Sequence, residues 1–176
     1  MSSIEWLEWS DPSFDTAQGS NKPVILFITA SWCRWCKTMT NETFTDEEVA
    51  SVINEEFVAI HVDKDKRPDI DARYNMGGWP TTAFLTPEGD VITGSTYFDP
   101  KNLKLLLEKI AKSYKENRNG IEKTIQEMIE KDCRKKKETA GAGQDLSLQI
   151  ITNASRSIIS EFDEKYGGFG TGQKFP

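Results

Sequence analysis

The residues of this chain best suited to chemistry are two cysteines separated by two positions, Cys33 and Cys36. They follow residues 24–28, a continuous apolar run typical of a strand buried on both faces, and they precede a segment expected to be helical. At the first turn of a helix, N–H groups without partners in the helix stabilise a thiolate. The pattern therefore predicts dithiol–disulfide exchange, in which Cys33 attacks a partner and Cys36 resolves the mixed disulfide.

Charged and aromatic side chains flank the pair. Arg34, between the cysteines, is expected to place positive charge beside the Cys33 thiolate. Trp32 and Trp35 adjoin the cysteines, and Trp79 lies in a later segment. The three rings could form an apolar platform for a partner peptide, and we expect contact with the partner for Trp35 and Trp79. For Trp32, packing on the domain itself is the favoured alternative.

Pro80 ends the sequence Gly-Gly-Trp-Pro at residues 77–80, just before a run that we expect to be a strand. A proline in this position suits a cis peptide bond, which is found almost only before proline and is retained where a turn requires it. The alternative is a trans proline in an ordinary loop. We expect the cis form, with Pro80 helping to shape the surface that binds the partner.

Half of a zinc site is another interpretation of the cysteine pair. A structural zinc ion needs four ligands, and the remaining candidates are His61 and Cys133. His61 falls within a strand pattern, and Cys133 lies at helical spacing from apolar residues, where a cysteine is usually a small buried hydrophobe. We therefore expect neither a metal site nor a cofactor.

Composition narrows the class of protein. Of the 176 residues, 37% are hydrophobic and 28% are charged, which is sufficient for a packed core, and the net charge of −6 argues against a nucleic-acid-binding surface. No apolar run approaches the roughly 20 residues of a membrane-spanning helix, and the N-terminus lacks the basic and apolar regions of a signal peptide. We expect a cytoplasmic protein that binds neither nucleic acid nor membrane.

The order of predicted elements favours an α/β fold, in which helices flank a central mixed sheet. Apolar runs predict the strands, and helical spacing and start signals predict the helices. The expected strands are 24–28, 57–62, 81–85 and 91–93, and the expected helices of this part begin near 11, 33, 45, 67 and 99. After residue 117 the character changes, and 119–138 and 145–164 are expected to form two amphipathic helices.

Several motifs, in order along the chain, resemble those of a known family. Residues 30–37, Ala-Ser-Trp-Cys-Arg-Trp-Cys-Lys, resemble the active-site segment of thioredoxin. A larger set resembles the N-terminal thioredoxin-like domain of the DUF255 family, also called the YyaL or spermatogenesis-associated protein 20 family. Along with the Cys-x-Trp-Cys pair, it comprises Lys22-Pro23-Val24, Glu42-Thr43-Phe44, Asp46-Glu47-Glu48-Val49, Phe57-Val58, Val62-Asp63, Arg67-Pro68-Asp69-Ile70-Asp71, Gly77-Gly78-Trp79-Pro80, Phe84-Leu85-Thr86-Pro87-Glu88-Gly89, Thr96-Tyr97-Phe98, Tyr166-Gly167-Gly168-Phe169-Gly170 and Lys174-Phe175-Pro176.

The resemblance implies a thioredoxin-like domain over residues 1–117, in which a cis-proline loop lies against the cysteine pair. It also implies that residues 118–176 are a helical extension leading toward a C-terminal domain similar to the (α/α)6 barrels of sugar-processing proteins. The implied partners are protein thiols or disulfides and the protein's own C-terminal domain.

Three positions depart from the patterns that the resemblance implies. The family commonly carries histidines where this chain has Arg34 and Lys37, so a metal or proton-transfer role for those histidines does not carry over. Thioredoxins also bury an acid six residues before the first cysteine, and here that position is Phe27. We therefore expect slow resolution by Cys36, because no nearby carboxylate is evident to accept its proton.

Two rival functions remain open. The domain could be a non-catalytic interaction module, which docks a sugar-barrel-like domain or another partner while its cysteines are incidental. A glycoside-processing activity would have to reside in the C-terminal domain, because the acids found close together here, Asp69 and Asp71, are expected to serve a helix start. The interpretation carried forward is a protein-disulfide oxidoreductase.

Overall fold

The computed structural model describes residues 3–139, 148–165 and 167–170, with the backbone alone described over 132–139. The chain divides into two compact units, Met1–Glu130 and Lys131–Pro176. The first unit contains the cysteine pair and two hydrophobic clusters, one on each face of a sheet.

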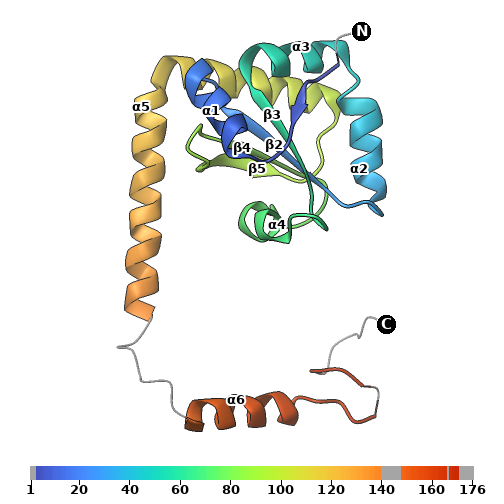
Figure 1. The fold of residues 1–176 in the computed structure, drawn as a ribbon, viewed down its shortest axis with the longest axis vertical. Coiled ribbons are helices and arrows are strands. Elements are labelled where there is room, and N and C mark those ends of the chain that lie inside the picture. Colours follow the sequence, from blue (N-terminus) through green and yellow to red (C-terminus); the bar gives the residue numbers. More distant parts are fainter. Residues whose placement is uncertain (1–2, 140–147, 166, 171–176) are drawn as a thin grey trace. The chain divides into compact units, whose positions relative to one another are not determined.

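The sheet of the first unit is mixed and has five strands (Figure 1). Its strand order is β1-β3-β2-β4-β5, where the strands are β1 (Trp6–Leu7), β2 (Val24–Thr29), β3 (Val58–Asp63), β4 (Thr81–Leu85) and β5 (Val91–Ser95). β2 occupies the middle, because it pairs in parallel with β3 and antiparallel with β4. Residues 24–28 are accordingly buried, as their unbroken apolar run predicts.

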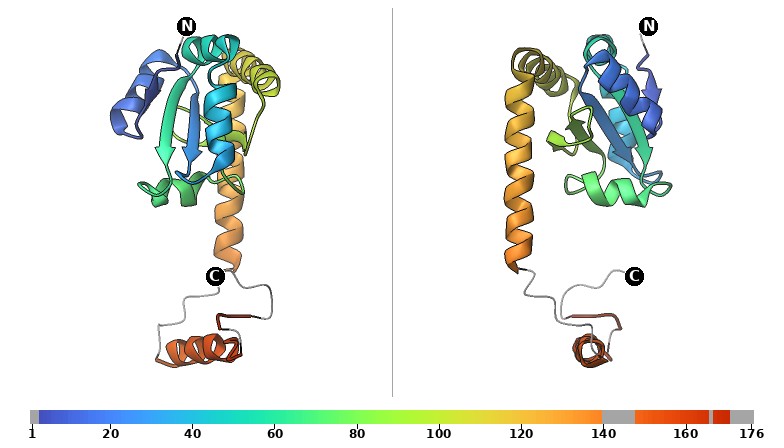
Figure 2. Two further views of the ribbon diagram at one scale, coloured as in Figure 1. Left: turned by 90° about the vertical axis from the view of Figure 1, so that its right-hand side faces the viewer. Right: turned by 60° about the vertical axis from the view of Figure 1, so that its left-hand side comes forward.

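Helices lie on both faces of this sheet (Figure 2). They are α1 (Asp11–Ser20), α2 (Arg34–Thr38), a π-helical turn η1 (Met39–Thr43), α3 (Glu47–Glu56), α4 (Pro68–Tyr74) and α5 (Pro100–Thr139). α1 and α4 pack on one face through Ala17, Ile70 and Tyr74. α3 and α5 pack on the other, where Ile53 and Leu107 are fully buried. The predicted central mixed sheet flanked by helices is confirmed.

The long helix α5 is interrupted at Asn117, whose backbone angles of φ −145° and ψ 44° are not helical. The domain boundary expected from the sequence falls at this residue, whereas the compact unit continues to Glu130. Beyond the interruption Ile125 is buried, with 8% of its surface exposed, and Gln126 Nε2 donates to Asp90 Oδ2 in the β4–β5 turn at 3.3 Å. Part of the helical extension is therefore docked on the first unit.

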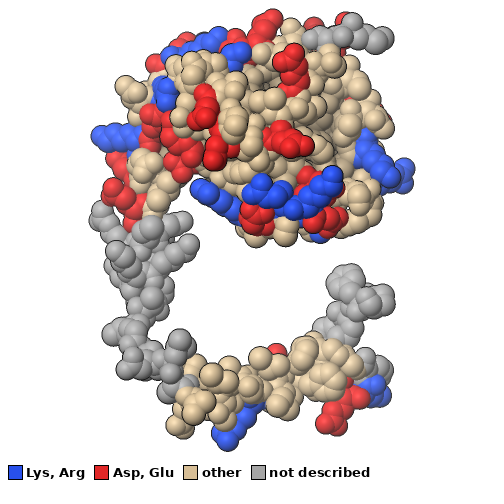
Figure 3. Space-filling model, in the orientation of Figure 1, with Lys and Arg blue, Asp and Glu red and all other residues tan. Residues whose placement is uncertain are grey.

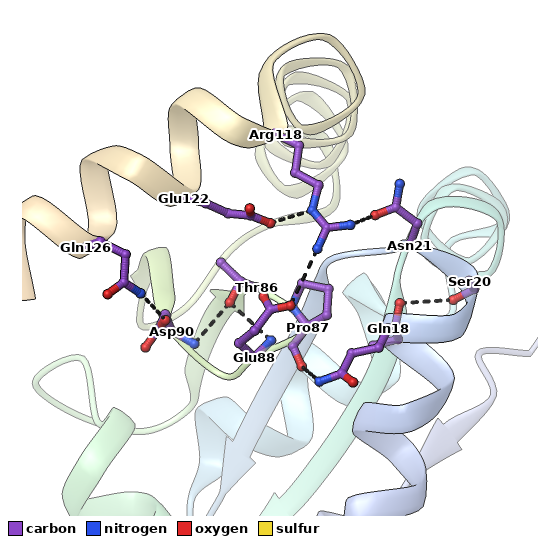
Figure 4. Close-up of polar contacts among 11 residues, drawn as sticks. Gln18, Ser20, Asn21, Thr86, Pro87, Glu88, Asp90, Arg118, Glu122 and Gln126 are labelled. Carbon is purple, nitrogen blue, oxygen red and sulfur yellow. Dashed lines mark hydrogen bonds and ion pairs between the residues drawn. The ribbon is translucent and has the colours of Figure 1, made fainter.

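Arg118 makes several of the polar contacts that accompany this docking (Figure 4). Its guanidinium donates to Asn21 Oδ1 at the end of α1 and to Glu122 Oε1 one turn further along α5. It also pairs with Glu88 of the β4–β5 turn at 3.4 Å. Partly exposed ion pairs of this kind stabilise a protein weakly, so we assign most of the docking energy to apolar burial.

The second unit contains α6 (Leu148–Ser160), none of whose residues is buried. After α6 the chain turns back, and a β-bridge pairs Phe162 with Phe169, whose ring centroids lie 5.6 Å apart. Residues 145–147 of the predicted helix and Tyr166 of the glycine-rich motif lie outside the described residues. No described helix is both long enough and apolar enough to cross a bilayer.

We predict that Ile125→Ala lowers the free energy of unfolding by about 2–4 kcal/mol, because it removes buried aliphatic surface and leaves a cavity. Ile129→Ala is the matched control one turn further along, since that side chain is 40% exposed, and it should cost less than about 0.5 kcal/mol. Urea titrations followed by far-UV circular dichroism measure both changes. Equal small losses for the two variants would contradict the docking of residues 118–130.

Candidate active site

Cys33 stands where the chain leaves β2 and enters α2. Its backbone N–H donates to Ala30 O at 3.0 Å, which closes the turn out of the sheet. Its Sγ accepts the N–H of Cys36 at 3.1 Å, so the sulfur itself caps the first turn of the helix. A hydrogen bond of this kind is stronger to a charged acceptor than to a neutral one, so this contact favours a thiolate over a thiol at Cys33.

Both cysteines are free thiols, and both are buried. Cys33 is 6% exposed and Cys36 is 3% exposed, and Ala30 packs with them in one small cluster. Burial, together with the hydrogen bond and charge of Cys33, raises the pKa of Cys36 to about 12. Cys36 therefore keeps its proton at neutral pH until a base removes it.

The peptide bond between Trp79 and Pro80 is cis, as the sequence predicts. The loop that contains it brings Trp79 O to 3.5 Å from Cys33 Sγ, and the thiol donates to this carbonyl. The side chain of Trp79 also packs against the cysteine cluster. Two segments distant in sequence, 33–36 and 79–80, thus meet at one place, as expected.

Two aromatic pairs flank the cysteines. The Trp32 ring meets the Trp79 ring edge-on with centroids 5.5 Å apart, and the Trp35 ring meets the Tyr97 ring edge-on at 5.2 Å. Trp32 and Trp35 are nevertheless 65% and 59% exposed. The expectation that Trp32 packs into the domain is therefore wrong, because the turn after β2 carries this residue beyond the end of the sheet.

Basic side chains lie on α2 beside the cysteines and near the rings of Trp32 and Trp79. Arg34 and Lys37 are exposed on α2, and Lys64 Nζ lies 4.9 Å from the centroid of the Trp79 ring and 5.7 Å from that of Trp32. Elsewhere the charges are mixed: Figure 3 shows acidic and basic side chains interspersed over the face of the first unit that it presents. That face carries none of the continuous basic surface expected of a nucleic-acid-binding protein.

Phe27 lies in the middle of β2, at the position where thioredoxins bury an acid. Its ring packs against those of Trp6 and Phe44, with centroids 5.7 and 4.7 Å away. The groups that shift the pKa of Cys36 are Cys33 and nearby backbone, and no carboxylate of the described residues is among them. The expectation from the sequence that Cys36 lacks a nearby carboxylate to accept its proton stays a prediction.

Three residues that adjoin the site, Lys64, Tyr97 and Asp71, were not among the site residues expected from the sequence. Asp71 is expected from the sequence to serve a helix start, but its carboxylate accepts the indole N–H of Trp79 at 2.9 Å. A capping pattern locates an acid at the beginning of a helix, yet it does not reveal which distant donor the acid meets. Only the fold brings the three residues to the cysteine pair.

A metal site at the cysteine pair would require further ligands. Within the described part of the chain, no group of three or more His, Cys, Asp or Glu side chains is placed to hold an ion. His61 Nε2 forms a hydrogen bond with Thr29 Oγ1 at 2.8 Å. The side chain of Cys133 lies outside the described residues, so the expectation that it is a buried hydrophobe stays a prediction.

Relatives of the chain are longer proteins. An uncharacterized protein of Caenorhabditis elegans is 34% identical over 187 residues, which cover 98% of this chain and 25% of that protein. Spermatogenesis-associated protein 20 of Rattus norvegicus is 33% identical over 190 residues, covering 98% of this chain and 24% of that protein. The chain thus spans about a quarter of the length of these relatives.

Solved structures share the fold. A thioredoxin from Thermus thermophilus has a TM-score of 0.57 at 20% identity, covering 64% of this chain and 90% of that chain. A DsbH oxidoreductase has a TM-score of 0.50 at 21% identity, covering 55% and 74%. The thioredoxin-like fold is therefore confirmed. A family model described as "Protein of unknown function, DUF255" matches residues 1–132, and the chain belongs to that family.

Proposed function

We propose that the domain is a thiol–disulfide oxidoreductase in which Cys33 attacks and Cys36 resolves. The observation that carries the proposal is the placement of Cys33 Sγ, which accepts the Cys36 N–H at 3.1 Å and lies 3.5 Å from Trp79 O. The first contact supports a thiolate at the attacking sulfur. The second places this sulfur beside the backbone of the cis-proline loop, where an extended partner segment can dock.

The exchange proceeds in two balanced steps. The Cys33 thiolate attacks one sulfur of a partner disulfide, so a Cys33–partner bond forms, the partner's own disulfide breaks, and its second sulfur leaves as a thiolate. Cys36 then loses its proton to solvent and attacks Cys33 Sγ, which releases the first partner sulfur as a thiolate. The partner gains two electrons and the domain becomes a Cys33–Cys36 disulfide; in the reverse direction the domain oxidises a partner dithiol.

The residues proposed to bind the partner lie beside the cysteine pair. The exposed rings of Trp32 and Trp35 offer apolar surface, while Trp79 and Pro80 supply the backbone edge beside Cys33. Arg34, exposed in the first turn of α2, adds positive charge that favours a thiolate nearby. The proposed partners are protein thiols or disulfides.

The remaining expectations concern the whole protein. We propose that residues 1–117 form the redox domain and that 118–176 lead toward a C-terminal domain similar to sugar-processing helical barrels, which would be a further partner. The relatives have room for such a domain, since the chain covers only about a quarter of their length. A cytoplasmic location is proposed, where a reducing environment would keep the pair as a dithiol.

The second candidate function is a non-catalytic interaction module. Two observations favour it: the pKa of Cys36 is raised to about 12, and the aromatic ring of Phe27 occupies the position of a proton-accepting acid. A pair that cannot complete the second step would serve only as part of a folded surface. The redox titration below separates the two functions.

In glutathione buffers of defined potential, we predict a reversible two-electron transition with a midpoint between about −120 and −270 mV, the range of known exchange proteins. Trp32 and Trp35 adjoin the cysteines and are expected to report the transition through intrinsic fluorescence. Cys33→Ser and Cys36→Ser should each abolish it. A pair that never cycles, or cycles only when the domain unfolds, would refute exchange and favour the interaction module.

The raised pKa of Cys36 predicts a resolution step that accelerates with pH. In a Cys33–glutathione mixed disulfide the charge of Cys33 is gone, but burial, the largest cause of the raised pKa of Cys36, remains. The thiolate fraction of Cys36, and with it the decay of the mixed disulfide, should therefore keep rising through about pH 8 without a plateau. Acid-quenched samples analysed by mass spectrometry measure this decay. In Cys36→Ser the mixed disulfide should persist, and a plateau near pH 8 would reveal a base that accepts the proton.

A further inference from the structure

The carboxylate of Asp71 lies in α4, beside the loop that carries the cis proline. Its Oδ1 accepts two hydrogen bonds, from Trp79 Nε1 at 2.9 Å and from Asn75 Nδ2 at 2.9 Å. The Oδ1 atom of Asn75 in turn accepts the N–H of Gly77 at 2.8 Å. One half-buried carboxylate therefore connects α4 to both the beginning and the end of the loop.

Trp79 connects Asp71 to the attacking sulfur. Its indole N–H is bound by Asp71, its carbonyl accepts the Cys33 thiol at 3.5 Å, and its ring packs against Trp32 at 5.5 Å. The three groups belong to one residue, so the orientation of the indole constrains where the carbonyl and the ring lie. A change at Asp71 is therefore expected to reach the surface formed by Trp79 and Trp32 beside the cysteines.

Lys64 adds a charge to the same cluster. Its ammonium lies 4.9 Å from the centroid of the Trp79 ring, within the range of a cation–π contact. The pKa of Lys64 is raised, first by its hydrogen bond to Asp65 and also by the charge of Asp71. Asp71 thus acts on the cluster in two ways, as an acceptor for the indole and as a negative charge, and substitution can separate them.

We propose that Asp71 is a positioning residue for disulfide exchange at Cys33. By holding the indole of Trp79, it sets the cis-proline loop where its backbone and the Trp32–Trp79 pair receive the partner peptide. This inference rests on the exchange function proposed above and goes beyond it, because it assigns a role in partner binding to a residue that acts through Trp79 rather than on the sulfurs.

The test uses the whole chain and three substitutions in α4. Asp71→Ala removes the acceptor and the charge, whereas Asp71→Asn retains an amide oxygen that can accept the indole N–H. Asp69→Ala is the matched control, because it removes the same charge from the same helix at an exposed position where the carboxylate pairs with Arg67 at 2.7 Å. The substrates are a peptide disulfide with apolar residues beside its cysteines, and iodoacetamide, whose reaction at Cys33 is followed by peptide mass spectrometry to separate it from Cys36 and Cys133.

Asp71→Ala should raise KM for the peptide disulfide about three- to tenfold, the effect expected when the hydrogen bond that holds the Trp79 indole is lost. The kcat and the rate of alkylation of Cys33 by iodoacetamide should change by less than about twofold, because the sulfur and its helix cap are untouched. Asp71→Asn and Asp69→Ala should stay within about twofold of the wild type in KM.

A double-mutant cycle adds a check on the route of the effect. Trp79→Phe retains an aromatic ring but removes the indole N–H, so it should raise KM as Asp71→Ala does, and the double variant should be no worse than either single variant. Additive losses would overturn the proposal. So would an unchanged KM in Asp71→Ala, an equal loss in Asp71→Asn, or a matching rise in alkylation rate, which would indicate general loosening.

Failure of the exchange function itself gives a different result. If the wild-type chain exchanges no disulfide, the proposed function fails, and the indole N–H resonance of Trp79 in NMR spectra, assigned with Trp79→Phe, then tests the role of Asp71 alone. A shift of that resonance in Asp71→Ala, but not in Asp71→Asn, would support positioning of the loop. An unshifted resonance would overturn it.

Discussion

The position of the cysteine site depends on β2, which is paired along both edges and packed on both faces. β2 is paired with β3 and β4 along almost its whole length, and helices cover both of its faces, so residues 24–28 are excluded from water. A strand fixed in this way has a fixed end. Cys33 begins a helix just beyond that end, and its sulfur meets the N–H of Cys36 in a defined direction rather than in a flexible loop.

The burial that orders the pair also makes the second half of the proposed reaction harder. Cys36 is excluded from water, and this favours its neutral thiol over the thiolate. The rings of Phe27 and Phe44 contribute to a dry core and carry no group that could take the proton. The same packing stabilises the domain, and in the proposed reaction the proton of Cys36 must then pass to solvent or to the partner.

In the helical extension, apolar burial and polar contacts make different contributions to docking. Beyond Asn117 the chain continues as a helix, and Ile125 loses most of its contact with water. Arg118 connects the helix to the end of α1 and to the β4–β5 turn, which fixes where the helix lies more than how strongly it is held. The compact unit therefore extends to Glu130, past the interruption in the helix.

Local patterns in the sequence are sufficient to predict the central strand, the cysteine pair at a helix start and the cis bond before Pro80. Each of them depends on residues adjacent in the chain: an unbroken apolar run, the spacing of two thiols, and a proline before a strand. The strand β1 has only Trp6 and Leu7, too few residues for any periodicity, and it exists because β3 offers an edge with which it can pair.

The surroundings of the site were decided by tertiary structure. The exposure of Trp32, the position of Lys64 over the Trp79 ring and the hydrogen bond from that indole to Asp71 all depend on how α4 and the surrounding loops come together. No composition or spacing encodes such contacts, because they depend on where the sheet places the ends of its strands. By itself the sequence determined which residues can react; the fold determined which residues hold them and which surface a partner meets.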